Sequence, residues 1–450
     1  MIKNKTVAFC TLGCRVNQYE TRAVEESFLK EGFTIGLFSD ECDVYVINTC
    51  TVTGESDRKS RQMIRRAVKN GKGKAIIAVM GCMSQVDAEA VSKIEGVSII
   101  LGNGEKMSCV QRVLSELSVI GSERNIDNTF VPDIYSYDSF EKMSVTGSDN
   151  TRAFLKVVDG CENKCSYCII PSARGKIRSK AISDVVSECR DIIKIGSCRE
   201  IVLTGIETAA YGKDLGTDLA SLAEEVSRVE GVARIRFGSL EPTVLKEDFV
   251  KRLSEIPSFM PHFHLSLQSG SDNVLARMKR KYNTAQFYEK VCLLRKYFPS
   301  CQITTDIIVG FPGETEEEFL QTAEFAKKCR FLYIHIFPYS DRKGTKASEM
   351  KGKLDEKTKQ ERVKALENVM HSVRLELLKE SLGKEMHILC ETDKDGFMHG
   401  YTENYIEVRT KNNGYKPNDI IRIKLETIET GGEFITSTPT EDQNGQHHQS

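Results

Sequence analysis

The segment Cys161-Glu-Asn-Lys-Cys165-Ser-Tyr-Cys168 follows an alternating, strand-like run from Ala153 to Val158 and the turn Asp159-Gly160. Three thiols separated by three and then two residues suit one compact metal centre, and thiolates select zinc or iron–sulfur clusters. Structural zinc usually takes four protein ligands, yet no fourth cysteine or histidine lies near this run. A four-iron cluster on three thiolates keeps one iron open, which is the position that catalysis needs.

The composition indicates a globular chain of several domains. Its 450 residues predict about three domains, and 40% hydrophobic residues allow full-sized cores. Because no apolar run could span a bilayer and the N-terminus lacks a signal-peptide core, we expect a cytoplasmic protein. Fifteen cysteines in a reducing compartment indicate metal binding or catalysis rather than disulfides. The formal net charge of −1 means that any contact with nucleic acid must come from local patches.

Residues 1–104 alternate apolar strands with helices. The two helices are expected near Gln18–Lys30 and Glu55–Asn70. Near-continuous apolar strands between helices predict a parallel sheet covered on both faces. The expected strands are Val7–Leu12, Asp43–Asn48, Ala75–Met80 and Val97–Leu101.

Three more cysteines occupy equivalent places in this layout. Cys14 lies just past the first expected strand, Cys50 just past the second and Cys82 just past the third. The carboxyl ends of parallel strands share one edge of a sheet, so we expect these thiols to meet and to be able to hold a second cluster. The alternative is that they are merely buried. Other cysteines of this part are expected to be ordinary small apolar or surface residues: Cys10, Cys42 and Cys109.

From Ala153 onward the strand–helix alternation resumes, after a stretch rich in Asp, Ser and Asn from Asp127 to Asn150 that resembles a linker. Six units predict a partial barrel of parallel strands, with the chemistry at the carboxyl ends of the strands. The expected strands are Ala153–Val158, Glu200–Thr204, Ala233–Ser239, His262–Leu267, Gln302–Val309 and Phe331–Phe337.

The C-terminal part changes character after a long helix expected at Asp355–Leu382, whose apolar stripe is assigned to core packing. Short alternating runs separated by turn residues in 384–434 predict a small β barrel, a type of fold that often binds RNA. The polar tail after Glu433 is expected to be disordered, and its His447-His448 pair is discounted as a metal site. The expected division is 1–125 N-terminal domain, 126–150 linker, 151–382 central domain, 383–440 β domain and 441–450 disordered tail.

The spacing Cys-x3-Cys-x2-Cys resembles the signature of radical S-adenosylmethionine (SAM) enzymes, in which the open iron binds SAM. Tyr167 is similar to the aromatic residue that shields the cluster in that family. Glu207 resembles the end of the Gly-Gly-Glu segment that holds the SAM amino group, although the second glycine is replaced. The resemblance makes Gln268 and Asp306 candidates for binding the SAM ribose or carboxylate, and Arg174, just after the cysteine loop, is a candidate for meeting phosphate or the SAM carboxylate. The alternatives are polar loop residues and a solvated basic face.

Further motifs resemble one radical SAM group, the methylthiotransferases. Gly13-Cys-Arg-Val-Asn17, Asn48-Thr-Cys50 and Gly81-Cys-Met83 fall in order before the central cysteines. The resemblance spans about residues 5–440. It implies an N-terminal cluster domain, a radical SAM domain and a C-terminal TRAM domain. The segments Leu12–Glu20 and Ser239–Pro242 look most like the subgroup that modifies threonylcarbamoyladenosine at position 37 of tRNA.

What the resemblance implies about chemistry is specific. A cluster on Cys161, Cys165 and Cys168 would cleave SAM to a radical, with electrons from a donor such as a flavodoxin or ferredoxin. A second cluster, with the three N-terminal cysteines as ligands, would carry the sulfur, and a second SAM would supply the methyl group. The hydrogen on carbon 2 of the base would be replaced by a methylthio group. An unreactive aryl carbon–hydrogen bond needs such cofactor chemistry.

Two alternatives stay open from the sequence. One is a ribosomal-protein aspartate methylthiotransferase, and the other is a non-catalytic, thiol-rich protein that binds zinc and RNA. Residues 384–434 carry seven Lys and Arg against ten Asp and Glu, a balance that weakens phosphate binding. The basic runs Arg58–Arg66 and Arg277–Lys281 are therefore the expected RNA contacts, or else solvated helix faces.

Overall fold

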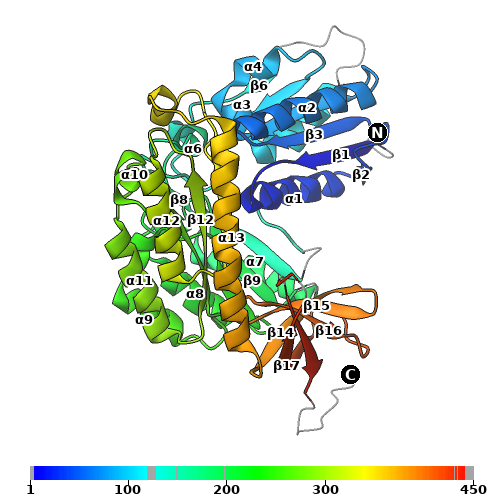
Figure 1. Cartoon of the computed structure of the whole chain (residues 1–450). Coiled ribbons are helices and arrows are strands. Elements are labelled where there is room, and N and C mark those ends of the chain that lie inside the picture. The colour runs from blue at the N-terminus through cyan, green and yellow to red at the C-terminus, as the bar shows by residue number, and fades with distance from the viewer. Residues whose placement is uncertain are drawn as a thin grey trace.

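Three bodies make up the chain in the computed structural model, which describes residues 5–118, 128–147, 151–196, 198–429, 431–432 and 434–440. An N-terminal sheet and a small C-terminal barrel lie on the same side of a central partial barrel, one above the other (Figure 1). The helix α13 (Glu356–Ser381) runs lengthwise along the central body. None of the helices among the described residues is long and apolar enough to cross a membrane.

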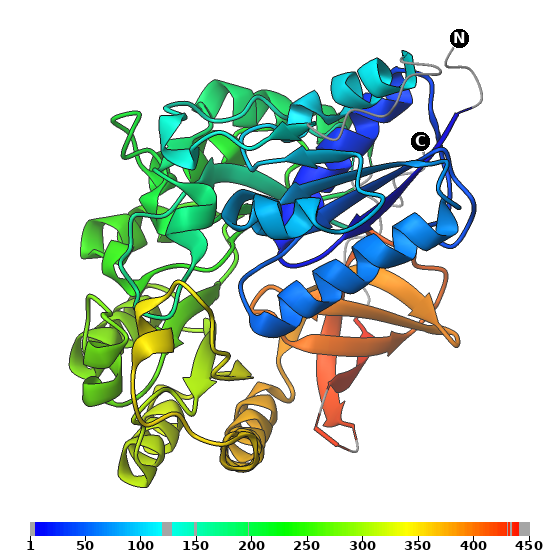
Figure 2. The same ribbon diagram turned by 90° about the horizontal axis from the view of Figure 1, so that it is seen from above.

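The N-terminal body is a six-stranded parallel sheet in the order β2-β1-β3-β4-β5-β6. Every residue of β3 and β4 is buried, because helices cover both faces (Figure 2). One face packs on α1 and α5, and the other on α2, α3 and α4. The covered parallel sheet is therefore confirmed. The bounds are β1 Thr6–Thr11, β2 Thr34–Ile35, β3 Val44–Thr49, β4 Ile76–Gly81, β5 Ile99–Leu101, β6 Thr129–Phe130, α1 Arg15–Lys30, α2 Gly54–Asn70, α3 Cys82–Val86, α4 Ala88–Ser92 and α5 Cys109–Ser118.

The segment expected to be a linker is packed against the protein where the structure describes it. Its strand β6 completes the N-terminal sheet, and Met143 and Val145 are buried in the core of the central body. The Val145 amide donates to Glu188 Oε1 at 2.7 Å. The apolar residues of this segment recur without a helical or strand period, so its packing could not be predicted from a composition that is mainly polar.

The central body is a partial barrel of six parallel strands, as expected. Strands β10, β9 and β7 form one sheet, which the short antiparallel β8 extends, and β11, β12 and β13 form another. Isolated bridges, including Leu240 to Leu265, join the two sheets between β10 and β11. Within the described residues β7 and β13 are not paired, so the barrel is open between them. The strand bounds are β7 Arg152–Asp159, β8 Arg178–Ser179, β9 Glu200–Gly205, β10 Arg234–Phe237, β11 His262–Gln268, β12 Gln302–Val309 and β13 Tyr333–Pro338.

Helices surround this barrel on the outside. The α13 helix begins after Asp355, whose side chain accepts from the Thr358 amide at 2.8 Å, and its stripe Leu366, Met370, Leu377 is buried. Core packing is thus the role of that stripe. The other helices are α6 Ile170–Arg174, α7 Ile182–Lys194, α8 Leu219–Ser227, α9 Glu247–Ser254, α10 Asp272–Arg277, α11 Thr284–Tyr297 and α12 Glu316–Cys329.

The C-terminal body is a closed five-stranded barrel in the order β14-β15-β16-β18-β17. Two of its strands differ from expectation. The β15 sequence was missed because Gly400 interrupts it; a Cβ there would lie 2.2 Å from the Leu389 carbonyl oxygen. The β18 strand lies after Glu433, where the polar sequence predicted disorder although the expected β domain extended to residue 440, and its Ile435 is fully buried. Residues 441–450, with His447-His448, lie outside the described residues. The bounds are β14 Glu385–Lys394, β15 Phe397–Thr402, β16 Glu407–Lys411, β17 Ile420–Ile428 and β18 Ile435–Pro439.

The small barrel is attached to the amino-terminal ends of the central strands. The Arg234 guanidinium on β10 donates to the carbonyl oxygens of Tyr401 and His387, both at 2.9 Å. Arg236 donates to the carbonyl oxygen of Glu403 at 2.9 Å and to that of Thr402. These buried bonds close one end of the central barrel with the C-terminal body.

Candidate metal centres and cofactor site

The central cysteine loop lies at the carboxyl end of β7. Gly160 turns the chain there with a φ of +84°, and a Cβ at this position would fall 1.7 Å from the Lys176 carbonyl oxygen. Only glycine allows so close an approach. The Cys161 amide then donates to the Gly175 carbonyl oxygen at 3.0 Å, just past α6. Backbone contacts therefore hold this loop in place.

The three thiols of this loop lie close enough to affect one another's ionisation. Burial, followed by the nearby Glu207 carboxylate, raises the pKa of Cys161 to about 12, and burial raises the pKa of Cys168 to about 12. The Arg280 Nη1 donates to Cys165 Sγ at 3.3 Å. Buried thiols at such spacing need additional positive charge to exist as thiolates, and a bound metal centre supplies it.

Arg280 is a site residue that sequence reasoning missed. The run Arg277–Lys281 was expected to face RNA or solvent, but Arg280 points into the protein. Its Nη2 donates to the Ser266 carbonyl oxygen at 3.1 Å and its Nε to Tyr282 Oη at 2.9 Å. Arg277 forms an ion pair with Glu318 at 2.6 Å. The run is therefore mainly structural. The cationic guanidinium of Arg280 contacts the cysteine loop.

Two of the expected SAM-binding residues lie around this loop. Glu207 Oε2 accepts from Asn163 Nδ2 at 2.5 Å and lies 3.7 Å from Cys161 Sγ. Burial, followed by the Glu241 carboxylate, raises the pKa of Glu207, as expected for a carboxylate that awaits a cationic partner. Gln268 ends β11 with a φ of +74°, at a register shift in the sheet. Strained backbone of this kind is concentrated at ligand sites.

The other two expected SAM-binding residues lie elsewhere. Asp306 is below the rim, inside the barrel, where its Oδ2 lies 3.2 Å from His264 Nε2. Arg174 is fully buried and pairs with Glu20 of α1 and with Asp159 of β7. Because Arg174 has no exposed surface, the structure corrects its assignment: it joins the N-terminal body to the central barrel rather than binding SAM.

The second group of cysteines lies at the carboxyl edge of the N-terminal sheet. Cys14 precedes α1, Cys50 follows β3, and Cys82 is the first residue of α3. Gly13 has a φ of +98°, and a Cβ there would fall 2.9 Å from Cys50 Sγ. The glycine beside Cys14 therefore allows the two loops to touch, and the three thiols converge as the strand-end argument required.

The electrostatics of this second trio resemble those of the first. Burial raises the pKa of Cys14 and of Cys50, and each of the two is raised further by the thiol of Cys82. Among the described residues, the only group of three ligands within 4.8 Å of one another is His264, Asp306 and His335. The sulfur atoms of neither cysteine trio are thus as close to one another as the ligand atoms of a site for a single ion. Wider spacing suits a cluster, which is larger than one zinc ion.

The loops that carry the two cysteine trios lie close together. Asn103 Nδ2 lies 3.6 Å from Cys82 Sγ and donates to the Ala173 carbonyl oxygen of α6 at 2.6 Å. The loop after β13 touches the Cys50 loop through Arg342, which bonds to Thr51 and Asp57. Figure 1 shows α3 and α6 next to each other where the two bodies meet. Two metal centres at these positions would lie near each other.

Comparisons with known proteins agree with this geometry. Residues 155–326 match the radical SAM superfamily, and residues 6–102 match the uncharacterized protein family UPF0004. A threonylcarbamoyladenosine tRNA methylthiotransferase MtaB from Bacillus subtilis is 39% identical, over 93% of each chain. The protein of that name from Aquifex aeolicus is also 39% identical, over 91% of this chain and 97% of its own. The chain belongs to the radical SAM methylthiotransferase family, MtaB type.

Two further comparisons extend this result. A tRNA-2-methylthio-N(6)-dimethylallyladenosine synthase from Acetivibrio thermocellus is 30% identical, over 95% of this chain and 90% of its own. Among solved structures, the radical SAM methyltransferase TsrM from Kitasatospora setae aligns with a TM-score of 0.55 at 14% identity, over 77% of each chain. That likeness concerns the fold and agrees with the partial barrel.

Radical SAM methylthiotransferases use two four-iron clusters and SAM as cofactors, and the side chains of this chain fit them. Each trio offers three soft thiolate ligands, so a four-iron cluster held by three thiolates would keep one iron position open. Glu207 offers a carboxylate for the SAM ammonium group next to Cys161. The chain is therefore a radical SAM methylthiotransferase whose side chains are suited to its family's cofactors.

Proposed function

We propose that this methylthiotransferase acts on tRNA and places a methylthio group on carbon 2 of N6-threonylcarbamoyladenosine at position 37. SAM would serve as both radical source and methyl donor. The observation that carries this proposal is the 37–39% identity, over 90–93% of the chain, to three relatives that bear the name of this activity. The closeness of the loops that carry the two cysteine trios supports it.

In this proposal the protein's own residues hold and orient the reactants. Cys161, Cys165 and Cys168 bind the SAM-coordinating cluster, and the N-terminal cysteine trio binds the auxiliary one. When bound, the clusters and SAM supply the radical chemistry and the sulfur that an aryl carbon–hydrogen bond requires. Glu207 accepts hydrogen bonds from the SAM ammonium group, and Gln268 is placed to bind its ribose or carboxylate.

Packing around the central loop keeps water away from this chemistry. Tyr167 meets Phe311 edge to face, with ring centroids 6.4 Å apart, and Ile169 is buried beside it. Arg280 donates to the Cys165 sulfur and stabilises the charge of the thiolate in this apolar setting. An electron donor such as a flavodoxin or ferredoxin would reduce the enzyme, and a tRNA substrate implies that the reaction takes place in the cytoplasm.

The exposed basic face of α2 is the proposed contact for the RNA backbone. This helix starts next to the Cys50 loop, and Arg65 and Arg66 on it are exposed. Replacing both with glutamate is expected to weaken tRNA binding and to lower the slope of log Kd against log salt by about 2, since each lysine or arginine that meets a phosphate contributes about one unit. A titration of binding against salt measures this slope.

The matched control reverses two charges on a remote helix. Arg190 and Lys194 are exposed on α7, on the outside of the central barrel. Their replacement with glutamate changes the net charge by the same amount and is expected to leave the slope unchanged. An equal loss of slope in both variants would indicate a general charge effect and count against α2 as the contact.

The direct test of the proposed function is a nucleoside analysis. Deleting the gene is expected to remove the methylthio form of threonylcarbamoyladenosine from tRNA, with the unmodified nucleoside accumulating in its place. Mass spectrometry of digested tRNA reads this nucleoside and the methylthio form of dimethylallyladenosine together. Loss of the second product instead, or of neither, would overturn the proposal. In the last case, copurification with a ribosomal protein would favour the aspartate-modifying alternative.

A further inference from the structure

The lumen of the central barrel contains a cavity that is not lined by the cysteines or by Glu207. Its volume is about 500 Å³, and it lies between the first halves of the central strands and the small C-terminal barrel. Tyr401, Tyr405 and Ile406 of that barrel close it below. Its size falls in the range of sites that enclose a small molecule.

Two aromatic side chains of β13, Tyr333 and His335, line one wall of this cavity, and Phe337 continues their row along the strand outside it. Tyr333 and Phe337 are 46% and 49% exposed, whereas Ile334 on the opposite face of the strand is 5% exposed. His335 lies between them, with ring centroids 4.8 Å from Tyr333 and 6.5 Å from Phe337. Because β13 is the strand at the open side of the barrel, this row can be reached from outside. Rows of aromatic rings are how proteins hold unstacked bases.

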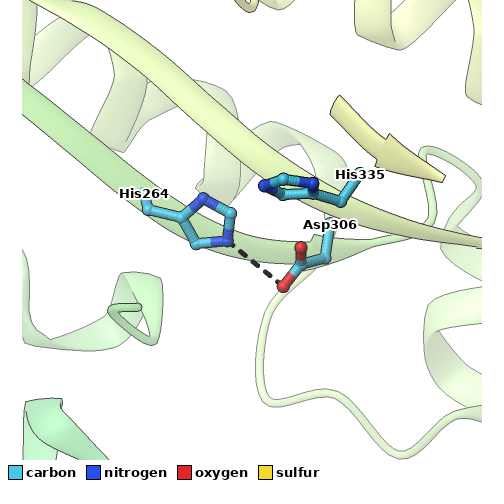
Figure 3. Close-up of side chains that lie close together, drawn as sticks. All are labelled: His264, Asp306 and His335. Carbon is cyan, nitrogen blue, oxygen red and sulfur yellow. Dashed lines mark ion pairs between the residues drawn. The ribbon is translucent and has the colours of Figure 1, made fainter. Parts of the chain in front are cut away.

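A polar cluster adjoins the row, with His264, Asp306 and His335 coming from three neighbouring strands (Figure 3). His264 Nε2 lies 3.2 Å from Asp306 Oδ2, and its Nδ1 shares a hydrogen bond of 2.9 Å with Thr304 Oγ1. These two contacts fix the orientation of the ring. Burial lowers the pKa of His335, so this ring is neutral near pH 7 and offers one donor and one acceptor.

Positive charge completes this part of the cavity. Arg374 of α13 reaches the wall, with its guanidinium carbon 5.9 Å from the centre of the Tyr333 ring. A ligand stacked on Tyr333 would place a carboxylate within reach of this cation, while its hydroxyl and amide groups could meet the histidines. Charge and hydrogen-bonding groups thus match a flat ring with a short, hydroxylated and anionic substituent.

We propose that this cavity binds the flipped-out substrate purine. Tyr333 stacks on the base, and His264, His335 and Arg374, which also line the cavity, bind its amino-acid substituent. This inference rests on the proposed function for the identity of that substituent, threonylcarbamoyl. A purely apolar substituent such as dimethylallyl would place hydrocarbon against the polar atoms of His335, a mismatch that proteins reject strongly. The cavity is therefore the specificity pocket of the enzyme.

The test uses the full chain with both clusters and three anticodon stem-loop RNAs. Position 37 carries threonylcarbamoyladenosine, dimethylallyladenosine or adenosine. His335→Phe keeps an aromatic ring but removes its polar atoms, so affinity for the first RNA should fall about tenfold while affinity for the other two holds. His335→Gln restores a donor and an acceptor and should recover part of the preference. Arg374→Met should act in the same direction as His335→Phe.

Stacking is tested separately from substituent recognition. Tyr333→Leu removes a ring from the row and should weaken binding of all three RNAs by about tenfold. Tyr297→Leu is the matched control, because this tyrosine belongs to the outer face of α11 and bonds to Glu247. Iron content and melting temperature of each variant establish that it is folded. If His335→Phe loses its clusters, His264→Phe provides the second variant for the same comparison.

The outcomes separate the inference from the function on which it rests. Wild-type enzyme that modifies only dimethylallyladenosine RNA would overturn the proposed function. Wild-type enzyme that modifies threonylcarbamoyladenosine RNA, while His335→Phe and His264→Phe keep its full preference, would overturn the specificity pocket alone. A third outcome is that the wild type binds cobalt stoichiometrically and that His335→Phe abolishes this binding. It would assign the polar cluster to a divalent cation and would also overturn the specificity pocket.

Discussion

Replacing Cys14, Cys50 and Cys82 with alanine is expected to lower the iron content from about eight to about four per chain and to abolish methylthiolation. SAM cleavage should persist, because the thiols of the central loop remain. The converse variant, with Cys161, Cys165 and Cys168 replaced, should show the same iron loss but no SAM cleavage. Iron and sulfide assays on anaerobic protein, together with chromatography of deoxyadenosine and of the nucleoside product, measure all of these results.

Two cysteines outside the trios provide the control. Cys292 is exposed on α11, and Cys42 is buried with no described role at either centre. Their replacement with alanine should leave the iron and sulfide content unchanged. One or two zinc ions without sulfide in the wild type would contradict the assignment and restore the thiol-rich binding module. Equal loss of SAM cleavage in both trio variants would show that the centres do not work independently.

The sequence was sufficient for the fold class and for the meeting of distant cysteines, for a simple physical reason. Parallel strands carry near-continuous apolar runs, and their carboxyl ends share one edge. Cys14, Cys50 and Cys82 each follow such a run, so their convergence could be predicted although up to 68 positions separate them. The same rule placed the loop of Cys161 at the end of β7. Local patterns that repeat at every strand can therefore be recognised in the sequence without knowledge of the tertiary structure.

Features that depend on three-dimensional partners could not be predicted. Arg280 belongs to a run that looks basic and solvated, and only the folded chain brings its guanidinium to 3.3 Å from Cys165 Sγ. Asp306 lies within its strand, as predicted, but its contact with His264 of the neighbouring strand could not be predicted. The final strand β18 was hidden because its threonines and serine are common in polar tails as well as in strands.

Replacing Glu20 is expected to have the largest effect on stability. This fully buried carboxylate accepts from Arg174, and its oxygens lie 2.8 Å from Lys106 Nζ and 2.7 Å from Lys156 Nζ. Removing one member of such a network leaves buried charges unpaired and costs about 3–5 kcal/mol. Glu20→Gln, which keeps the shape, should therefore lower the denaturant midpoint clearly. Glu55→Gln, at an exposed ion pair with Arg58, is the control and should have no measurable effect.

The pH dependence of this loss follows from the pKa of Glu20. Burial raises that pKa, but Arg174, Lys106 and Lys156 outweigh burial and hold it well below the usual value. A carboxylate with a lowered pKa contributes its full stability above its unfolded-state pKa of about 4.3 and loses it as pH falls toward the folded value. The gap between wild type and Glu20→Gln should thus be constant from pH 8 to 5 and shrink below about pH 4.

This network also bears on the chemistry, since it connects the two metal centres. Arg174 donates to Oδ1 of Asn17, which lies three residues after Cys14, at 2.7 Å. Arg174 is also the last residue of α6, the short helix that follows the central cysteine loop. Burial lowers the pKa of Arg174, but Cys82, Glu20 and Asp159 raise it well above its usual value, so Arg174 keeps its positive charge close to the N-terminal cysteines. We expect Glu20→Gln to lose part of the N-terminal cluster before the central one. Iron loss that begins at the central loop would contradict this order.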